Sequence, residues 1–393
     1  MREVLPDLLR WWQAGETVGI GTVSATFQSA PRPPGAAMLV GPDGTVVGSV
    51  SGGCVEGAVY DVACKVRQLA IDQRRSAGRP DQIQSGAVLQ RYGISDDDAF
   101  TVGLTCGGVI DIFVEAISAT TFPEFGSLAT SIEAGEPVAL ATVTAGRPDQ
   151  VGRHLLVWPE SIAAGLGSDR LDDAVRDDAR GMLAGGLTGT LHYGLDGQRR
   201  GEELSVFVSS FAPAPRMLIF GAIDFAAAVA RVGAFLGYRV TVCDARPVFS
   251  TSRRFPDADE VVVDWPHRYL ATQVQAGAID GRTVICVLTH DPKFDVPVLA
   301  AALRLPVAYV GAMGSRHTHR DRLDRLAEVG LSQAELSRLS SPIGLDLGAR
   351  TPQETAISIA AEIIARRWDG AGTPLSETSG AIHRHAPSRS PHR

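Results

Sequence analysis

The spacing of hydrophobic and polar positions changes about halfway along the chain. In the first half, short alternating apolar runs separated by turn residues predict strands, and longer stretches with apolar residues three or four apart predict helices. The expected strands are 17–24, 36–40, 45–49, 84–92, 109–115, 137–144, 153–158, 189–193 and 204–211, and the expected helices are 55–69, 122–134 and 169–182. We find no internal repeat in this pattern. The first half is therefore expected to form one mixed α/β domain.

The second half alternates regularly between short apolar runs and helical stretches. The apolar runs are 217–220, 239–243, 260–263, 283–288 and 307–310. This alternation predicts a Rossmann-like, doubly wound parallel sheet. The prolines between residues 211 and 216 stiffen the chain and exclude a central strand. The expected division is a mixed α/β domain over 1–211, a linker over 212–216, the Rossmann-like domain over 217–370 and a disordered tail over 371–393.

The last helix of the second domain has a clear start signal. Thr351 followed by Pro352 and by Glu354 forms a capping box with proline at the first helical position. Apolar residues recur along the helix at Ile357, Ala361, Ile364 and Trp368. This spacing predicts the face that packs against the sheet.

Composition narrows the function classes. The chain has 393 residues, 45% of them hydrophobic, and a formal net charge of −7. That charge argues against a nucleic-acid surface, because binding to phosphate backbones needs clustered Lys and Arg. No apolar run reaches the roughly eighteen residues of a membrane span. The five cysteines have no regular spacing and the first residues have no apolar signal core, so we expect a protein of the reducing cytoplasm.

Two glycine–cysteine stretches are the strongest candidates for chemistry. They are 48–56, with Gly52, Gly53 and Cys54, and 105–108, with Cys106 and Gly107. Glycine lets the backbone approach a ligand closely, and a helix N-terminus can hold a preceding cysteine as thiolate. The alternative is that both cysteines are small buried hydrophobes beside tight turns. Zinc ligation is a third interpretation, but no paired C-x-x-C or nearby histidine completes four ligands.

The first strand-to-helix turn of the second domain resembles a dinucleotide fingerprint with defects. Gly221 and Asp244 stand where the first glycine and the ribose-binding acid would stand. Ile223 replaces the second glycine, and the carboxylate of Asp224 can occupy the donors that a phosphate would use. Because Arg246 follows Asp244 closely, these residues do not decide between binding a ribose hydroxyl, as in NAD, and binding a 2′-phosphate, as in NADP. NAD(P) binding, and with it an oxidoreductase, is therefore the alternative hypothesis.

Later turns at the carboxyl edge of the same sheet supply further candidates. His290 follows the fourth strand and can carry a proton or cap the next helix. Gly314, Ser315 and Arg316 follow the fifth strand and can cradle an anion at a helix start. The alternative is that Ser315 caps this helix and that its later arginines, Arg322 and Arg325, pair with neighbouring acids in solvent. Asp346, in the loop before Thr351, is a possible ligand contact.

These motifs, in this order, resemble the XdhC/CoxI family, the maturation factors of xanthine dehydrogenase and related molybdenum hydroxylases. The resemblance covers about residues 1–368 through the motifs at 48–56, 105–108, 289–295, 311–320 and 341–354. The chain departs from the family at Ile223, where a glycine is frequent. The resemblance implies an N-terminal XdhC/CoxI-type domain before the Rossmann-like domain.

The resemblance also implies a function. It implies binding of molybdenum cofactor (molybdopterin), help in its sulfuration, and its delivery to an apo-molybdenum hydroxylase, with a cysteine desulfurase as second partner and a homodimer as a further possibility. Under this hypothesis Cys54 and Cys106 contact the cofactor or relay sulfur, and the second domain holds the pterin phosphate. The chain would then be an accessory factor and not itself an oxidoreductase.

Overall fold

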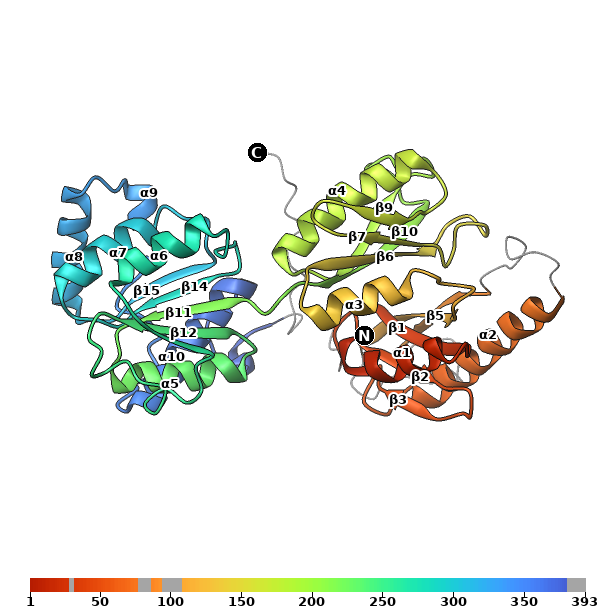
Figure 1. Ribbon diagram of the computed structural model, residues 1–393, viewed down its shortest axis with the longest axis horizontal. Helices are drawn as coiled ribbons and strands as arrows, with labels where there is room; N and C mark the ends of the chain where they lie inside the picture. The colour runs from red at the N-terminus through yellow and green to blue at the C-terminus, as the bar shows by residue number, and fades with distance from the viewer. Residues whose placement is uncertain (28–31, 77–85, 94–107, 380–393) are drawn as a thin grey trace. The chain divides into compact units, whose positions relative to one another are not determined.

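The computed structural model describes residues 1–27, 32–76, 86–93 and 108–379, and it divides them into two compact units (Figure 1). Unit 1 contains Met1–Pro213, and unit 2 contains Ala214–Ser379. The last strand of unit 1 ends at Phe211 and the first strand of unit 2 begins at Arg216. Each unit has its own hydrophobic clusters.

Unit 1 begins with an antiparallel sheet of order β3-β2-β1-β5-β4. Its strands are β1 (Val18–Phe27), β2 (Ala37–Val40), β3 (Val46–Gly48), β4 (Val88–Tyr92) and β5 (Val109–Ile117), and its helices are α1 (Leu5–Gln13), after the 3-10 turn Arg2–Val4, and α2 (Glu56–Ser76). Helix α2 lies very close to β1. A Cβ added to Gly19 would lie 2.7 Å from the carbonyl oxygen of Ala63, so glycine is required at this contact.

A second antiparallel sheet follows with the equivalent order, β8-β7-β6-β10-β9. Its elements are α3 (Phe125–Ala134), β6 (Val138–Ala145), β7 (His154–Val157), β8 (Ile162–Ala164), α4 (Asp169–Gly185), β9 (Gly189–Tyr193) and β10 (Leu204–Phe211). Both halves of unit 1 therefore run helix, three strands, helix, two strands, with the same strand order. Unit 1 is built from an internal structural duplication.

The expectation of no internal repeat was therefore wrong. The sequence does carry the signal: Ala14-Gly15-Glu16 before β1 matches Ala134-Gly135-Glu136 before β6. In both copies the glycine has a left-handed φ, 76° and 68°, which ends the preceding helix. The repeat escapes notice because the loops of the two copies differ in length and composition, so no constant period extends beyond the first strand.

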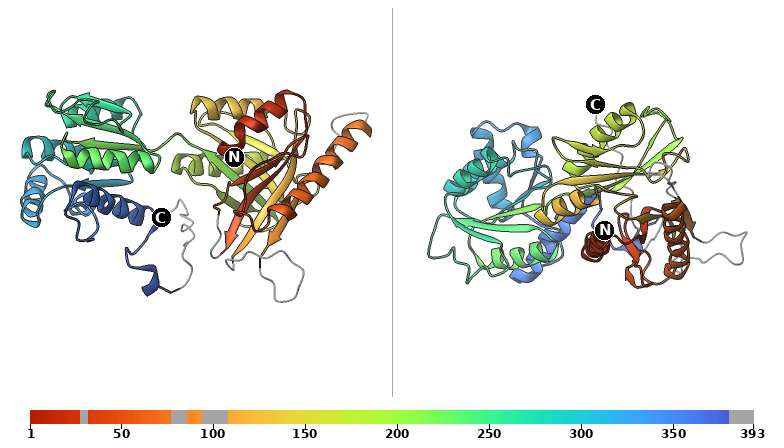
Figure 2. Two further views of the ribbon diagram at one scale, coloured as in Figure 1. Left: turned by 90° about the horizontal axis from the view of Figure 1, so that it is seen from below. Right: turned by 45° about the vertical axis from the view of Figure 1, so that its right-hand side comes forward.

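The two halves bury three apolar layers. One cluster fills the space between the sheets and takes residues from β1, β6, α1 and α3. The other two clusters place α2 against the outer face of the first sheet and α4 against that of the second. Figures 1 and 2 show α2 and α4 on opposite sides of the unit. Charge-rich α4 is thus amphipathic, with Leu171, Val175, Ala179 and Leu183 buried.

Unit 2 is a six-stranded parallel sheet of order β13-β12-β11-β14-β15-β16, which confirms the predicted Rossmann-like class. The strands are β11 (Arg216–Phe220), β12 (Arg239–Asp244), β13 (Glu260–Val263), β14 (Val284–Val287), β15 (Tyr309–Ala312) and β16 (Leu339–Ser340). The helices are α5 (Asp224–Phe235), α6 (Pro266–Gln275), α7 (Pro292–Ala302), α8 (Arg316–Glu328), α9 (Gln333–Leu336), α10 (Pro352–Trp368) and the 3-10 turn Leu375–Glu377. The strand order reverses direction between β11 and β14, so the ligand-binding crevice of such folds is expected there.

Helix α10 starts as predicted but packs on a different face. The capping box is present, since the Thr351 hydroxyl accepts the Glu354 N–H at 3.2 Å and the Glu354 carboxylate accepts the Thr351 N–H at 3.0 Å. The predicted apolar face is wrong: Ile357 is 53% exposed and Trp368 is 50% exposed, whereas Ile359 is buried.

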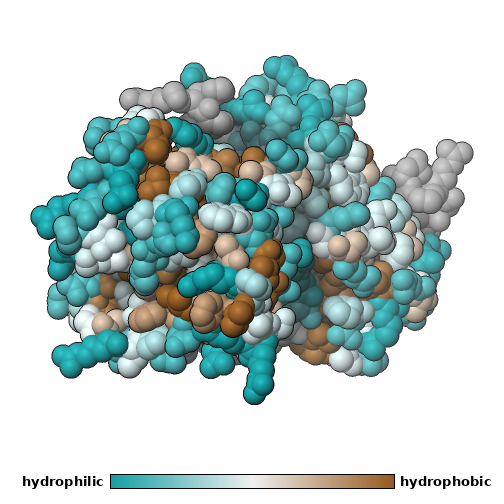
Figure 3. Space-filling view, turned by 60° about the vertical axis from the view of Figure 1, so that its left-hand side comes forward, coloured by the Kyte–Doolittle hydropathy of each residue, from teal (hydrophilic) through white to brown (hydrophobic). Residues whose placement is uncertain are grey.

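Polar residues of α10 explain this rotation. The Glu362 carboxylate points into the unit, where it accepts the Tyr309 hydroxyl at 2.6 Å and the Gly344 N–H at 2.7 Å. Ser358 donates its hydroxyl to the carbonyl oxygen of Leu345 at 2.5 Å. Because these buried groups must face their partners, part of the apolar stripe faces outward. The face of the molecule in Figure 3 shows apolar side chains as patches among polar ones. Within the described residues, no helix is both long and apolar enough to cross a membrane.

Candidate functional site

The glycine–cysteine loop of unit 1, residues 49–55 between β3 and α2, is folded around one carboxylate. Glu56, the first residue of α2, accepts the Ser49 hydroxyl at 2.6 Å and also the Ser51 hydroxyl. Its oxygens also accept backbone N–H groups from Val50 at 3.2 Å, Ser51 at 2.9 Å, Gly53 at 2.9 Å and Val55 at 3.2 Å. The shape of the loop therefore depends on a single charged side chain.

The charge of Glu56 is strongly favoured in this setting. Partial burial would raise its pKa, but the hydrogen bonds from Ser49, Ser51 and the loop backbone outweigh burial and lower the pKa to about 2. The amides of Gly53 and Val55 at the amino end of α2 thus donate hydrogen bonds to Glu56. We expected this helix end to serve a thiolate at Cys54; the structure assigns these two donors to a carboxylate.

Cys54 itself lies at the surface of the loop. It is half-buried and contacts the cluster between α2 and the first sheet, and its N–H donates to the Ser51 hydroxyl at 3.0 Å. Gly52 and Gly53 are exposed and have left-handed φ angles of 75° and 118°. Among the described residues, no atom lies within 4 Å of a Cβ added to either of them or to Gly57. The described part of the chain therefore leaves the backbone around Cys54 open.

Cys106 and Gly107 lie outside the described residues, but the strand that follows them is well placed. Helix α2 runs antiparallel to β1, because Gly19 faces Ala63 and Gly21 faces Val59. Its amino end therefore points toward the end of β1, where Phe27 pairs with Val109, the first residue of β5. Cys54 and the start of β5 thus lie toward the same end of the first sheet, the end at which β1 stops.

The duplicated half of unit 1 provides an internal comparison for these loops. The connection that corresponds to 49–55 is 165–168 between β8 and α4, and it contains no cysteine. The connection that corresponds to 93–108 is 194–203 between β9 and β10, which is also shorter. The second copy forms the same sheet with these short loops. The fold of the repeat therefore does not need the longer cysteine-bearing loops.

The cysteines of unit 2 are not candidates for sulfur chemistry. Cys243 and Cys286 are buried in the parallel sheet, and burial raises the pKa of each thiol to about 12. Across residues 1–27, 32–76, 86–93 and 108–379, no three His, Cys, Asp or Glu side chains converge as a possible metal site.

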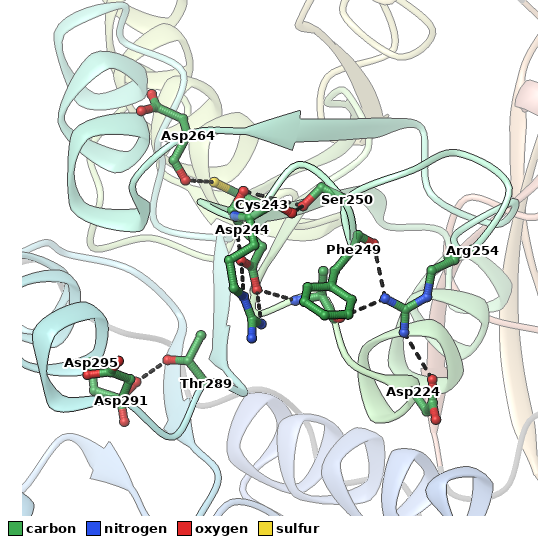
Figure 4. Close-up of polar contacts among 12 residues, drawn as sticks. Asp224, Cys243, Asp244, Phe249, Ser250, Arg254, Asp264, Thr289, Asp291 and Asp295 are labelled. Atoms are coloured by element: carbon green, nitrogen blue, oxygen red, sulfur yellow. Dashed lines mark hydrogen bonds and ion pairs between the residues drawn. The ribbon is translucent and has the colours of Figure 1, made fainter.

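In unit 2 the turn after β11 and the end of β12 are tied together (Figure 4). Gly221 has a φ of 115°, and an added Cβ would lie 2.9 Å from the backbone nitrogen of Thr289, so glycine is required there. The Asp244 carboxylate accepts the Ala222 N–H at 2.8 Å and both Nε and Nη2 of Arg246, at 2.9 and 2.7 Å. Its side chain is 2% exposed.

Asp244 is therefore not an open ribose-binding acid. Burial would raise its pKa, but the hydrogen bonds from Arg246 and Ala222 lower the pKa below its ordinary value, so the pair with Arg246 stays charged. The prediction that Asp244 contacts a cofactor is not supported by this arrangement. The expectation for Asp224 was also wrong, because its carboxylate is 87% exposed and pairs with Arg254 at 3.1 Å rather than capping α5.

A buried ion pair that sequence analysis missed joins the later turns of the same edge. Arg322 and Asp295, 3% and 5% exposed, are in contact at 2.9 Å. Arg322 also donates to the Met313 carbonyl at 2.8 Å and to the Ser341 hydroxyl at 3.0 Å, while Thr289 donates to Asp295. We expected Arg322 to pair in solvent. It instead connects the turns after β14, β15 and β16.

The predicted contact residues stand on these turns. Ser315 caps α8, since its hydroxyl accepts the Thr318 N–H at 3.1 Å, so its side chain is already engaged. Arg316, His290 and Asp346 are exposed. Gly314 precedes the cap, and a Cβ added to it would lie 3.2 Å from the side chain of Thr318 and 3.4 Å from that of Arg322. Among described residues, no hydrogen bond or ion pair reaches the His290 ring, so no proton-relay partner identifies it as catalytic.

Comparison with known families agrees with this architecture. A family model described as the XdhC Rossmann domain matches residues 217–363, which form most of unit 2. A model described as the XdhC and CoxI family matches residues 11–76 and 131–194, one segment in each half of unit 1. The chain belongs to the XdhC and CoxI family.

Similar proteins extend over almost the whole chain. A Bacillus subtilis protein, named as a probable subunit of xanthine dehydrogenase, is 27% identical over 90% of this chain and 94% of its own length. The molybdenum cofactor insertion chaperone PaoD of Escherichia coli is 27% identical over 93% of this chain and 88% of its own. A crystal structure described as a xanthine dehydrogenase from Bacillus halodurans shares the fold, with a TM-score of 0.62 and 24% identity over 92% of this chain and 95% of that one.

The buried pair predicts a large effect of removing one partner. Arg322→Leu leaves the Asp295 carboxylate buried without its cation and should lower the free energy of unfolding by about 3 kcal/mol. Arg325→Leu, on the exposed side of the same helix, is the control and should change it by less than about 0.5 kcal/mol. Urea unfolding measures both. Equal effects of the two substitutions would contradict the structural role of Arg322.

Glu56 predicts a pH-dependent effect. The folded pKa is about 2 and the ordinary value is 4.5, so the stabilisation is complete above pH 4.5 and is lost as the pH falls toward 2. Glu56→Gln should cost about 1 kcal/mol at pH 7, and the difference from the unsubstituted chain should shrink from pH 4.5 to pH 3. Glu133→Gln, on exposed α3 surface, is the control in urea unfolding. A difference that does not vary with pH would contradict this account of Glu56.

Proposed function

We propose that this chain is a molybdenum cofactor insertion chaperone, which binds the cofactor and delivers it to an apo-enzyme of the xanthine dehydrogenase type. The names of the relatives that extend over both units support this function, since one is a molybdenum cofactor insertion chaperone and another a probable xanthine dehydrogenase subunit. The cofactor is cargo in this proposal, so the chain needs to hold and release it but does not need to turn over a substrate.

The observation that carries the proposal is the presentation of Cys54. A half-buried thiol stands beside exposed glycines on a loop that is hydrogen-bonded to Glu56 and that the fold of the repeat does not need. Thiolate is a soft ligand and suits molybdenum and sulfur chemistry. Open backbone on both sides of the thiol suits a bulky cargo. Cys106, with Gly107, is proposed as the second thiol, because the strand after it starts toward the same end of the first sheet.

The pterin phosphate is assigned to the turn before α8. Arg316 is exposed there and a guanidinium binds phosphate well, while the amides at the start of a helix of 13 residues favour an anion. Gly314 lets the backbone run close to the helix, and Ser315 acts by fixing its start. His290 and Asp346, exposed on neighbouring turns, are proposed as further contacts.

The proposal also includes assistance in sulfuration. A cysteine desulfurase is the proposed partner that supplies the sulfur, and Cys54 or Cys106 would contact the cofactor. The half-buried position of Cys54 supports this assignment, because the unit 2 thiols are buried and protonated. A homodimer stays a prediction from the family resemblance.

Activation of a co-expressed molybdenum hydroxylase tests the proposal. Cys54→Ala should lower the specific activity of the hydroxylase at least tenfold while the chain keeps its folded stability, and Cys106→Ala should act in the same direction. Cys64→Ala is the matched control, because Cys64 is also a half-buried thiol of unit 1 but lies within α2. It should leave activation unchanged.

Two results would contradict the proposal. Full activation by the Cys54→Ala chain would remove the thiol from the function. Equal loss with Cys64→Ala would show that the effect follows from folding and not from the presented loop.

A further inference from the structure

A small pocket of unit 2 lies outside the residues to which the proposed function assigns a contact. It has a volume of about 180 Å³ and is lined by Ala222, Ile223, Asp224, Arg246, Phe249 and Arg254. The first three residues form the turn from β11 into α5, and the other three belong to the segment after β12 (Figure 4). The pocket thus lies between the turn that follows β11 and the segment that follows β12.

Two guanidinium groups and one aromatic ring define the chemistry of this pocket. The guanidinium carbons of Arg246 and Arg254 lie 4.8 and 5.6 Å from the centroid of the Phe249 ring. Phe249 is 43% exposed, and the two arginine side chains are 48% and 33% exposed. Stacked guanidinium and aromatic planes bind flat heterocycles, and the edges of the same guanidinium groups bind phosphate.

The arginines are held in place by the protein. Arg254 donates to the carbonyl oxygens of Ala222 and Phe249, both at 3.2 Å, and Arg246 is fixed by its two bonds to Asp244. Arg–carboxylate bonds of this bidentate kind orient the guanidinium plane. The cluster is therefore organised before any ligand arrives, which lowers the entropy cost of binding.

A phosphate that binds Arg254 must displace the carboxylate of Asp224. This carboxylate contacts Arg254 at 3.1 Å but is 87% exposed. An exposed ion pair of this kind contributes little free energy, so a phosphate of higher charge can displace it. The usual dinucleotide mode does not fit the same features, since it needs the acid after the second strand to bind a ribose, and both oxygens of Asp244 already accept hydrogen bonds from Ala222 and Arg246.

We propose that this pocket binds a nucleoside phosphate, with its base stacked on the cluster of Arg246, Phe249 and Arg254 and its phosphate on Arg254. Asp224 competes with that phosphate. This inference stands apart from the proposed function, because it needs neither the thiols of unit 1 nor the turn before α8. Failure of one proposal therefore leaves the other unaffected.

Isothermal titration of the full chain with ADP tests the inference. We expect a dissociation constant of about 0.1 mM. Arg254→Ala and Phe249→Ala should each weaken binding about tenfold, and Asp224→Asn should strengthen it about threefold. Arg231→Ala is the control, because Arg231 pairs with Asp257 on the exposed side of the same helix α5 and should leave the affinity unchanged.

Comparison ligands make each outcome decisive. Inorganic phosphate should bind at least tenfold more weakly than ADP, because it lacks a base to stack. NAD⁺ should bind no more tightly than ADP. Absence of ADP binding up to 5 mM, equal affinity in Arg254→Ala and Arg231→Ala, phosphate binding as tightly as ADP, or NAD⁺ binding more tightly than ADP would each overturn the proposal.

Discussion

The position of the Cys54 loop depends on the hydrogen bonds that the Glu56 carboxylate accepts from it. A loop with two exposed glycines in left-handed conformations would ordinarily adopt many shapes, because glycine loses more backbone freedom on folding than any other residue. Here four backbone amides and two hydroxyls converge on one side chain, so the loop has a single shape. The result is a thiol that is held in position while the backbone around it stays accessible.

The duplication of unit 1 separates what the fold requires from what the function adds. The second half repeats the strand order with shorter connections and without cysteine, and a first-turn acid holds its loop in a similar way, since Asp172 accepts the Leu166 N–H at 2.7 Å. An acid near the helix start is thus a shared structural device of both halves. The cysteine belongs to the first half alone, whereas the second connection also contains glycines, Gly165 and Gly167, and the presence of the thiol favours a role beyond folding.

Sequence analysis predicts the scaffold well where a local signal determines structure. Buried parallel strands are continuous apolar runs, so the sheet of unit 2 was predictable, and the capping box fixed the start of α10 at Thr351. Contacts between distant residues were not predictable. Arg322 looks like any surface arginine of a charged helix until the fold places Asp295, far back in the sequence, beside it.

The candidate site was predictable only in part for the same reason. Glycines beside Cys54 identify the loop, but nothing in the sequence states that Glu56 takes the amides of that loop. Likewise Asp244 stands at the fingerprint position that would contact a ribose. In the structure its carboxylate accepts hydrogen bonds from Arg246 instead. In both cases a charged neighbour in the chain competes for the groups that a ligand would use, and only the folded geometry shows which partner is selected.

Co-purification of the cofactor tests the central claim most directly. The chain is purified from cells that make molybdenum cofactor, then oxidised, and the fluorescence of the released pterin is measured per chain. The account predicts pterin with the unsubstituted chain, and at least tenfold less with Cys54→Ala and with Arg316→Ala. Absence of pterin from the unsubstituted chain, or equal pterin in all three, would contradict the claim that this protein binds the cofactor with the help of Cys54 and Arg316.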